Sequence, residues 1–308
     1  MKRRCFMGGA LALMMASACT HQEPPPAAPP AALPAAPPKP AALADGTPQI
    51  VDSADGVHIE YQVYGHGDPA VVLVHGWSNN SNYWNAQLDE LKARYTVVTL
   101  NLAGHGASER NREDWSMANY AADVAAVVHE IPNRKVVLVG HAMGGIVVLE
   151  AARLIGSRVI GIIAVDSLKS IGQPPMSKAQ FEEQVQRFRE NFIGHMHDFV
   201  SSYLFTRNAD PLFVRKVADD MAHASPQVAI PSLEAVYHYD FAALPAIHVP
   251  IIAINSDLHM PTDEARIRKL APTFRSIVVP GAGHFLMMES PARFNPILLQ
   301  AIASLEKP

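Results

Sequence analysis

The stretch VLVGHAMGGIVVLEAARLIG, residues 137–156, begins as an apolar β-type run and passes abruptly into a helical pattern through a glycine-rich corner. Gly140 and Gly144 lie two positions before and two positions after the apex of that corner. A side chain at either place would collide with a tight strand-to-helix turn, so such a turn requires glycine there. The apex itself is Ala142, which carries no nucleophilic atom.

Short runs dense in Val and Ile recur on both sides of this corner. They are AVVLVHG (70–76), YTVVTL (95–100), KVVLVG (135–140), VIGIIAVD (159–166), PIIAINSD (250–257) and RSIVVPG (275–281). Continuous apolar strands are typical of a parallel sheet that is buried on both faces. Helical patterns at 117–131 and 143–156 separate some of the runs, and two alternating runs around Asp55-Gly56 predict an N-terminal β-hairpin. This order predicts an α/β fold with a mostly parallel central sheet, an initial hairpin and helices on both faces.

One long segment, residues 168–245, lacks such strands and carries polar helical patterns instead. It is too long for a loop without structure of its own. We therefore expect a helical cap at 168–245, inserted before the late strands, and a core made of 49–167 and 246–308. Six aromatic residues of the cap either line a pocket or form the cap's own core, and their helical spacing favours the core. These residues are Phe181, Phe188, Phe192, Phe199, Tyr203 and Phe205.

The first 18 residues have the layout of a secretory signal peptide, with cationic residues at 2–4 followed by an apolar stretch at 6–15. That stretch is shorter than the roughly 20 residues that a membrane-spanning helix needs. Ser17-Ala18-Cys19 resembles the end of a bacterial lipobox, which implies lipid attachment to Cys19, whereas Ala16-x-Ala18 also suits ordinary cleavage. We expect an exported protein that is periplasmic or held at the outer membrane as a lipoprotein, with secretion as the alternative.

Residues 19–48 are rich in Pro and Ala, a composition that favours an extended linker. The two cysteines, Cys5 and Cys19, precede the predicted core, so we expect no disulfide and no thiolate metal site within it. The formal net charge is −4 and no basic run follows the leader, which argues against nucleic acid as a partner.

Five motifs occur in an order that resembles the α/β-hydrolase fold. They are HGW (75–77), NLAGHGAS (101–108), VGHAMGG (139–145), INSDLHMP (254–261) and VPGAGHF (279–285). The resemblance covers residues 50–304 and is closest to esterase-like and lactonase-like members with a helical cap. It implies a serine hydrolase that needs no metal and no organic cofactor.

The same resemblance implies roles for particular residues. Ala142 occupies the position of the nucleophilic serine, and His284, which follows the last predicted strand, is the expected base. Asp257 is the favoured acid, because it directly follows the strand-forming run that ends at Ser256. Asp166 is the alternative, because some relatives hold the acid at the end of the preceding strand.

An oxyanion hole would be formed by the backbone N–H groups of Trp77, which follows His75-Gly76, and of Met143, which follows the apex residue Ala142. His75, Gly76 and Met287 are expected at the pocket because each is adjacent to one of these elements. His195 and His197 have too few companions to form a metal site, so no metal is expected.

The sequence therefore predicts hydrolysis of small carboxylic esters or lactones through an acyl-enzyme, in a chain that Ala142 leaves nearly inert. Loss of the nucleophile costs about a millionfold in turnover in a serine protease. One alternative is a natural pseudoenzyme that binds a small ligand in the former active-site pocket. A second is lyase or cofactor-free oxygen chemistry in which His284 acts without a nucleophile.

Overall fold

The computed structural model describes residues 45–174, 176–241 and 247–306. The predicted signal peptide at 1–18, most of the linker at 19–48 and the lipidation candidate Cys19 lie outside the described residues. Within the described part of the chain, no helix is long and apolar enough to cross a membrane.

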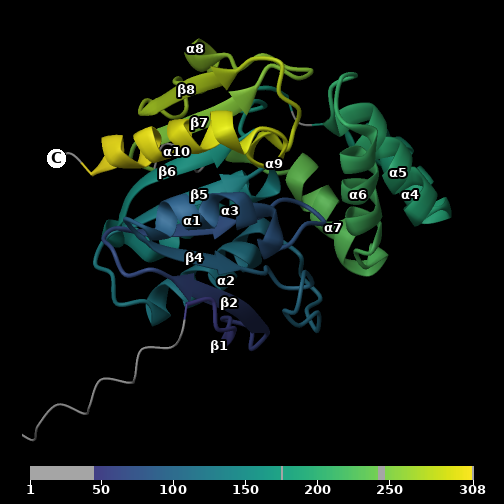
Figure 1. The fold of residues 1–308 in the computed structure, drawn as a ribbon. Coiled ribbons are helices and arrows are strands. Elements are labelled where there is room, and N and C mark those ends of the chain that lie inside the picture. The colour runs from purple at the N-terminus through teal and green to yellow at the C-terminus, as the bar shows by residue number, and fades with distance from the viewer. Residues whose placement is uncertain (1–44, 175, 242–246, 307–308) are drawn as a thin grey trace, which may run out of the picture. The chain divides into compact units, whose positions relative to one another are not determined.

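An eight-stranded sheet in the order β1-β2-β4-β3-β5-β6-β7-β8 forms the centre of the core (Figure 1). Its strands are β1 (Gln49–Asp52), β2 (His58–Tyr64), β3 (Ala70–Val74), β4 (Thr96–Leu100), β5 (Val136–His141), β6 (Val159–Val165), β7 (Ile251–Ser256) and β8 (Phe274–Val279). The pairs β1–β2 and β2–β4 are antiparallel, and all the other pairs are parallel. The predicted mostly parallel sheet with an N-terminal hairpin is confirmed.

Helices cover both faces of this sheet, which explains why its central strands are buried and mostly apolar. In Figure 1, α1 (Asn85–Lys92) and α10 (Pro291–Leu305) pack together on the nearer face, and α2 (Met117–Glu130) and α3 (Met143–Ile155) on the other. Every residue of β3, β4, β5 and β7 is buried. The core also contains the short helices α8 (Glu264–Ile267) and α9 (Leu286–Glu289) and 3-10 turns at Ser81–Trp84 and Gly156–Arg158.

The cap is formed by helices inserted between β6 and β7, and Figure 1 shows them gathered beyond one end of the sheet. They are α4 (Lys178–Glu190), α5 (Phe192–Phe199), a π-helical turn (Val200–Leu204), α6 (Pro211–Ala222) and α7 (Pro226–Tyr237). The first begins at Ser177 in a capping box with Gln180 and buries Phe181, Val185 and Phe188 along one stripe. The predicted helical cap before the late strands is therefore present.

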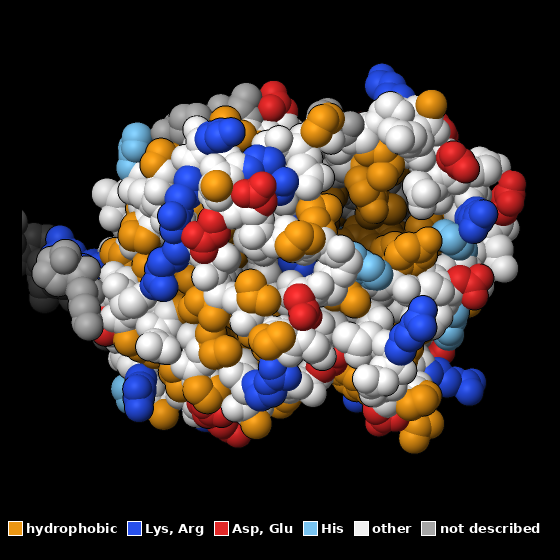
Figure 2. All heavy atoms as spheres, turned by 90° about the horizontal axis from the view of Figure 1, so that it is seen from above, with side chains coloured by type: hydrophobic (Ala, Val, Ile, Leu, Met, Phe, Trp, Pro, Cys, Tyr) orange, Lys and Arg blue, Asp and Glu red, His pale blue; other side chains and the backbone are white. Residues whose placement is uncertain are grey.

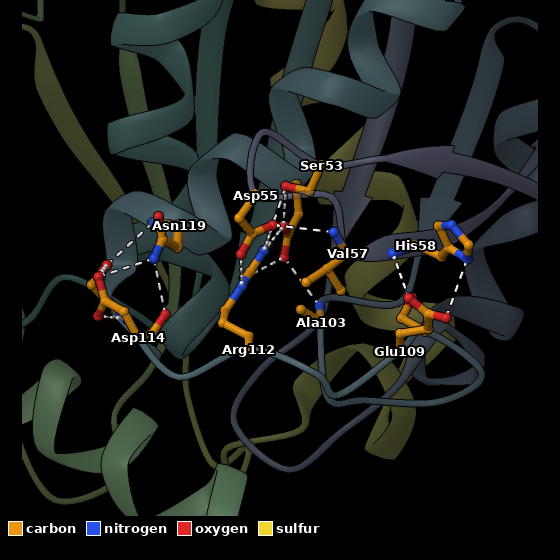
Figure 3. A network of polar contacts seen from close by, with 12 residues as sticks. Ser53, Asp55, Val57, His58, Ala103, Glu109, Arg112, Asp114 and Asn119 are labelled. Carbon is orange, nitrogen blue, oxygen red and sulfur yellow. Dashed lines mark hydrogen bonds and ion pairs between the residues drawn. The ribbon is translucent and has the colours of Figure 1, made fainter.

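A buried ionic network fastens the N-terminal hairpin to the core (Figure 3). The side chain of Arg112 is only 1% exposed and donates to Asp123 of α2 at 2.5 Å and to Asp55 of the hairpin turn at 2.7 Å. Ser53 Oγ and the backbone N–H of Ala103 also donate to Asp123, at 2.6 and 3.1 Å. Burial raises the pKa of Asp123 even though Arg112 opposes this shift. The carboxylate thus depends on its partners to remain charged.

Candidate active site

The corner between β5 and α3 is as tight as its glycines predict. Ala142 has φ 48° and ψ −114°, a backbone conformation that costs a residue with a side chain about 1–3 kcal/mol. A Cβ added to Gly140 would lie 2.1 Å from the carbonyl oxygen of Gly144, and one added to Gly144 would lie 2.6 Å from that of Val74. Neither position has room for any other residue.

Hydrogen bonds from neighbouring strands and loops hold this strained apex. The N–H of Ala142 donates to the carbonyl of Val165 at 3.0 Å, and its own carbonyl accepts from Ser167 Oγ at 2.6 Å and from the N–H of Gly145 at 3.0 Å. Because the backbone is held on both sides, the Cβ of Ala142 lines the cavity beneath the cap.

His284 follows β8 and lines the same cavity, with 20% of its side chain exposed. Its loop is held from two directions. Its N–H donates to the carbonyl of Leu204 in the cap at 2.8 Å, and the carboxylate of Glu289 accepts from the N–H groups of Gly283 and Phe285 at 3.2 and 3.1 Å. The predicted base therefore lies at the cavity that contains the apex of the corner, in a loop whose backbone is fixed.

The carboxylate beside this histidine is Asp166 and not the favoured Asp257. Oδ2 of Asp166 lies 2.6 Å from Nδ1 of His284. Asp257 is exposed, and its Oδ1 accepts from the N–H of Gly281 at 2.8 Å. The assignment of the acid to Asp257 is thus wrong, because the last residue of β7, Ser256, turns its own N–H and hydroxyl toward Asp166. Successive side chains of an extended chain point in opposite directions, so the side chain of Asp257 points away.

Asp166 is 8% exposed and all its contacts favour the ionised form. Oδ1 accepts from the N–H and hydroxyl of Ser256, both at 2.8 Å, and from Nζ of Lys169 at 2.7 Å. Burial works against the charge, but the contacts with His284 and Lys169 outweigh it and hold the pKa of Asp166 well below its usual range. Neither Lys169 nor Ser256 was predicted from the sequence, where the one local signal was a lysine three positions after an aspartate at a strand end.

Two buried histidines are structural supports of the site. The N–H of Leu102 donates to His75 Nε2 at 3.0 Å, so His75 carries its proton on Nδ1 and donates to the carbonyl of Gly76 at 2.8 Å. His141 Nε2 lies 3.0 Å from the carbonyl oxygen of His284 and donates to it. Burial lowers the pKa of both rings, that of His141 to about 3, so both are neutral at pH 7.

The two predicted oxyanion segments meet at the corner. Trp77 and Met143 both line the cavity, and a Cβ added to Gly76 would lie 3.3 Å from the Cβ of Ala142. The indole Nε1 of Trp77 donates to the carbonyl of Ala229 in the cap at 2.7 Å, which fixes the loop that follows β3.

The cavity has a volume of about 620 Å³ and lies between the corner and the cap. Figure 2 shows the hollow, which is lined largely by hydrophobic side chains. Of the six cap aromatics named from the sequence, Phe199 and Tyr203 line it. The other four are buried, but only Phe181 and Phe192 pack within the cap, whereas Phe188 packs on Trp77 and Phe205 on Phe285 of the core. This divides a set for which the sequence left both roles open.

Three residues expected at the pocket are placed differently. His75 and Gly76 are both buried and do not line the cavity. Met287 does not line it either, since it is fully buried in α9 and its carbonyl accepts from Gln87 Nε2 at 2.8 Å. Adjacency in the chain to His284 was a poor guide, because the helical turn carries Met287 inward.

No group of three or more His, Cys, Asp or Glu side chains within residues 45–174, 176–241 and 247–306 is arranged to hold a metal ion. His195 packs on the ring of Phe188 at 4.3 Å between centroids, and His197 lies 3.3 Å from Asp219. Both therefore have other contacts in the cap.

A parallel sheet whose fifth strand turns through such a corner, with a histidine after the eighth strand, defines the class of α/β hydrolases. The model of the family described as "Alpha/beta hydrolase family" matches residues 71–297. The chain therefore belongs to this family.

The relatives found by sequence and by structure have diverse activities. A non-heme haloperoxidase from Rhodococcus erythropolis is 30% identical over 278 residues, which cover 83% of this chain and 99% of that protein. A thermophilic esterase from Thermogutta terrifontis has a TM-score of 0.73 at 22% identity and covers 85% of this chain and 100% of its own. The enol-lactonase from Burkholderia xenovorans LB400 has a TM-score of 0.72 at 17% identity and covers 82% and 99%. The two structures establish similarity of fold.

Proposed function

We propose that this chain, with serine in place of Ala142, hydrolyses carboxylic esters or lactones of small molecules through an acyl-enzyme. The observation that carries the proposal is the 2.6 Å contact of His284 with Asp166 at the cavity that also contains the apex of the corner. A base held by a carboxylate at the mouth of a strand-to-helix corner is the arrangement that activates a hydroxyl nucleophile. Alanine has the backbone and Cβ of serine and lacks only that oxygen.

The proposed reaction uses each of these groups in turn. The hydroxyl oxygen introduced by Ala142→Ser attacks the carbonyl carbon while Nε2 of His284 takes its proton. The backbone N–H groups of Trp77 and Met143 receive the oxyanion, and His284 returns the proton to the departing alkoxide. Water then releases the acid by the same route. Asp166 remains ionised and holds His284 with its proton on Nδ1.

The cavity favours uncharged substrates with an apolar acyl or alcohol part. Its volume of about 620 Å³ lies within the range of pockets that bury a small molecule, and apolar side chains such as Ile146, Leu233 and Val236 form much of its wall. The esterase and lactonase names of two structural neighbours agree with this class of substrate.

The retained cavity also favours a second candidate, a pseudoenzyme that binds a small ligand without turning it over. In this chain Ala142 removes the nucleophile while Asp166 and His284 are kept and the cavity is open. One experiment distinguishes a pseudoenzyme that binds without turnover from a hydrolase that is active with serine at position 142.

The experiment compares the chain, its Ala142→Ser variant and Ala142→Ser with His284→Ala on nitrophenyl esters of increasing acyl length and on simple lactones. We expect Ala142→Ser to raise turnover by several powers of ten and His284→Ala to abolish the gain. A serine variant as inert as the alanine chain would reject the hydrolase proposal. Tight binding of an ester product by the alanine chain would then favour the pseudoenzyme.

A further inference from the structure

Lys169 is the one lysine among the described residues that line the cavity, and its side chain is largely removed from water. Only 12% of its side chain is exposed, and Nζ lies 2.7 Å from Oδ1 of Asp166. Nζ also lies 3.3 Å from Ser256 Oγ and 3.4 Å from the carbonyl oxygen of Leu258. An ammonium group removed from water to this extent needs such partners, because its desolvation is otherwise costly.

The two carboxylate oxygens of Asp166 have different partners. Oδ1 accepts from Lys169 Nζ and from the N–H and hydroxyl of Ser256, whereas Oδ2 faces Nδ1 of His284. A carboxylate with one oxygen held by three donors cannot rotate about its terminal bond without breaking all of them. The direction of Oδ2 is thereby fixed toward the histidine.

Lys169 also connects two loops. It lies three residues after Asp166 on the loop that follows β6, and its contacts with Ser256 and Leu258 reach the loop that follows β7. Asp166 itself has φ 41°, so its backbone is held in a sparsely populated conformation at this junction. The loop that the sequence predicted to carry the acid instead helps to hold the acid of the neighbouring strand.

Charged and titratable groups from three core elements surround His284. Asp166 lies at the end of β6, neutral His141 at the end of β5 with its ring centroid 4.7 Å away, and Glu289 on α9 accepts from the N–H groups on either side of the histidine. Lys169 adds a cation that contacts Asp166 directly, and this contact helps to keep the carboxylate ionised.

We propose that Lys169 is a positioning residue of the active site, which holds Oδ1 of Asp166 and so orients Oδ2 toward His284. Its catalytic consequence rests on the proposed hydrolase function. Its structural consequence, the fixed contact between Asp166 and His284, exists in the alanine chain as well.

The kinetic test is made in the Ala142→Ser background with Lys169→Met, Lys169→Arg and the control Lys135→Met. Lys135 is exposed and precedes β5 at the end opposite the corner. We expect Lys169→Met to lower kcat for a nitrophenyl ester about tenfold or more with little change in KM. Lys169→Arg should restore most of kcat, because its guanidinium can again donate to Oδ1 of Asp166, and Lys135→Met should leave both kcat and KM unchanged.

A second measurement needs no activity. In the alanine chain, the proton between His284 Nδ1 and Asp166 should give a strongly deshielded NMR resonance, which broadens or disappears in Lys169→Met and persists in Lys169→Arg. An active serine variant in which Lys169→Met changes neither the resonance nor kcat would overturn the role of Lys169 and leave the hydrolase proposal intact. Loss of the resonance in Lys169→Met together with an inactive serine variant would support the positioning role and reject the hydrolase.

Discussion

Asp166 and His284 lie 118 positions apart in the chain, yet their side chains meet at 2.6 Å. The carboxylate comes from the end of β6 and the imidazole from the loop after β8, so β7 lies between the two strands in the sheet. Ser256 at the end of β7 donates to the carboxylate. The pair is therefore assembled across three neighbouring strands.

Exchange of the acid should distinguish the two aspartates. In the Ala142→Ser background, Asp166→Asn should lower kcat by about 10³–10⁴, because an amide cannot stabilise the imidazolium and favours the wrong tautomer. Asp257→Asn should stay within about threefold, since Asp257 is exposed and contacts Gly281. Steady-state kinetics on one nitrophenyl ester measures both, and a larger loss in Asp257→Asn would return the acid to β7.

Removal of Arg112 should destabilise the fold without touching the site. Arg112→Met leaves the buried carboxylate of Asp123 without its main partner, which should lower the free energy of unfolding by about 3–5 kcal/mol. Arg215 is largely exposed on the cap, and Arg215→Met should change it by less than about 0.5 kcal/mol. Urea unfolding measures both. The double variant Arg112→Met with Asp123→Leu should recover part of the loss, and the absence of recovery would count against an unpaired charge as the cause.

The tightness of the corner can be tested with single methyl groups. Gly144→Ala places a Cβ 2.6 Å from backbone carbonyl oxygens, which cannot move away, and should cost about 2–3 kcal/mol. Gly56, in the hairpin turn, has φ +82° with no atom within 4 Å of an added Cβ, so Gly56→Ala should cost only about 1 kcal/mol for its left-handed backbone. Equal midpoints of thermal or urea unfolding would show that the corner can relax.

Buried histidines predict weaker folding in mild acid. Burial lowers the pKa of His105 to about 4 and that of His141 to about 3. Below pH 6.5 the unfolded chain therefore binds protons that the folded chain does not, and stability falls as the pH falls toward 4. Each ring contributes up to about 1.4 kcal/mol per pH unit in this window. Urea unfolding from pH 7 to pH 4.5 should show a shallower fall in His141→Gln than in the parent chain, whereas the exposed His223→Gln should leave the slope unchanged.

The leader sequence, which lies outside the described residues, predicts that the protein is attached to a membrane through a lipid on Cys19. Lipid on Cys19 would hold the exported protein in the membrane fraction of a bacterial host, and Cys19→Ala would release it. Fractionation followed by immunoblotting measures this. A parent chain found free in the periplasm or medium would instead favour ordinary cleavage before residue 19.

Much of the fold could be predicted from local sequence patterns. The strands, the tight corner and the position of His284 after the last strand could all be predicted, because each depends on a few consecutive residues. The identity of the catalytic acid could not be predicted in this way. Aspartates follow both β6 and β7, and the choice between them depends on the direction in which Ser256 and Asp257 leave the strand. That direction follows from packing between strands.

The contacts of the cap residues also could not be predicted from the sequence. Helical spacing favoured a place in the cap core for the six aromatics named above, but the arrangement of the helices decides that Phe199 and Tyr203 face the cavity. The same holds for Lys169, whose burial beside Asp166 depends on the loop after β7. A charged residue in a sequence is by default a surface residue, so the sequence offered no reason to single it out.

The bond from the N–H of His284 to the carbonyl of Leu204 has a mechanical consequence. Leu204 ends the π-helical turn of the cap, next to Tyr203, whose carbonyl oxygen lies 2.5 Å from Nε2 of His259. A cap that moved away from the core would break the Leu204 bond, and His284 would then keep its contacts with Asp166 and His141. The position of the histidine loop therefore depends in part on the position of the cap.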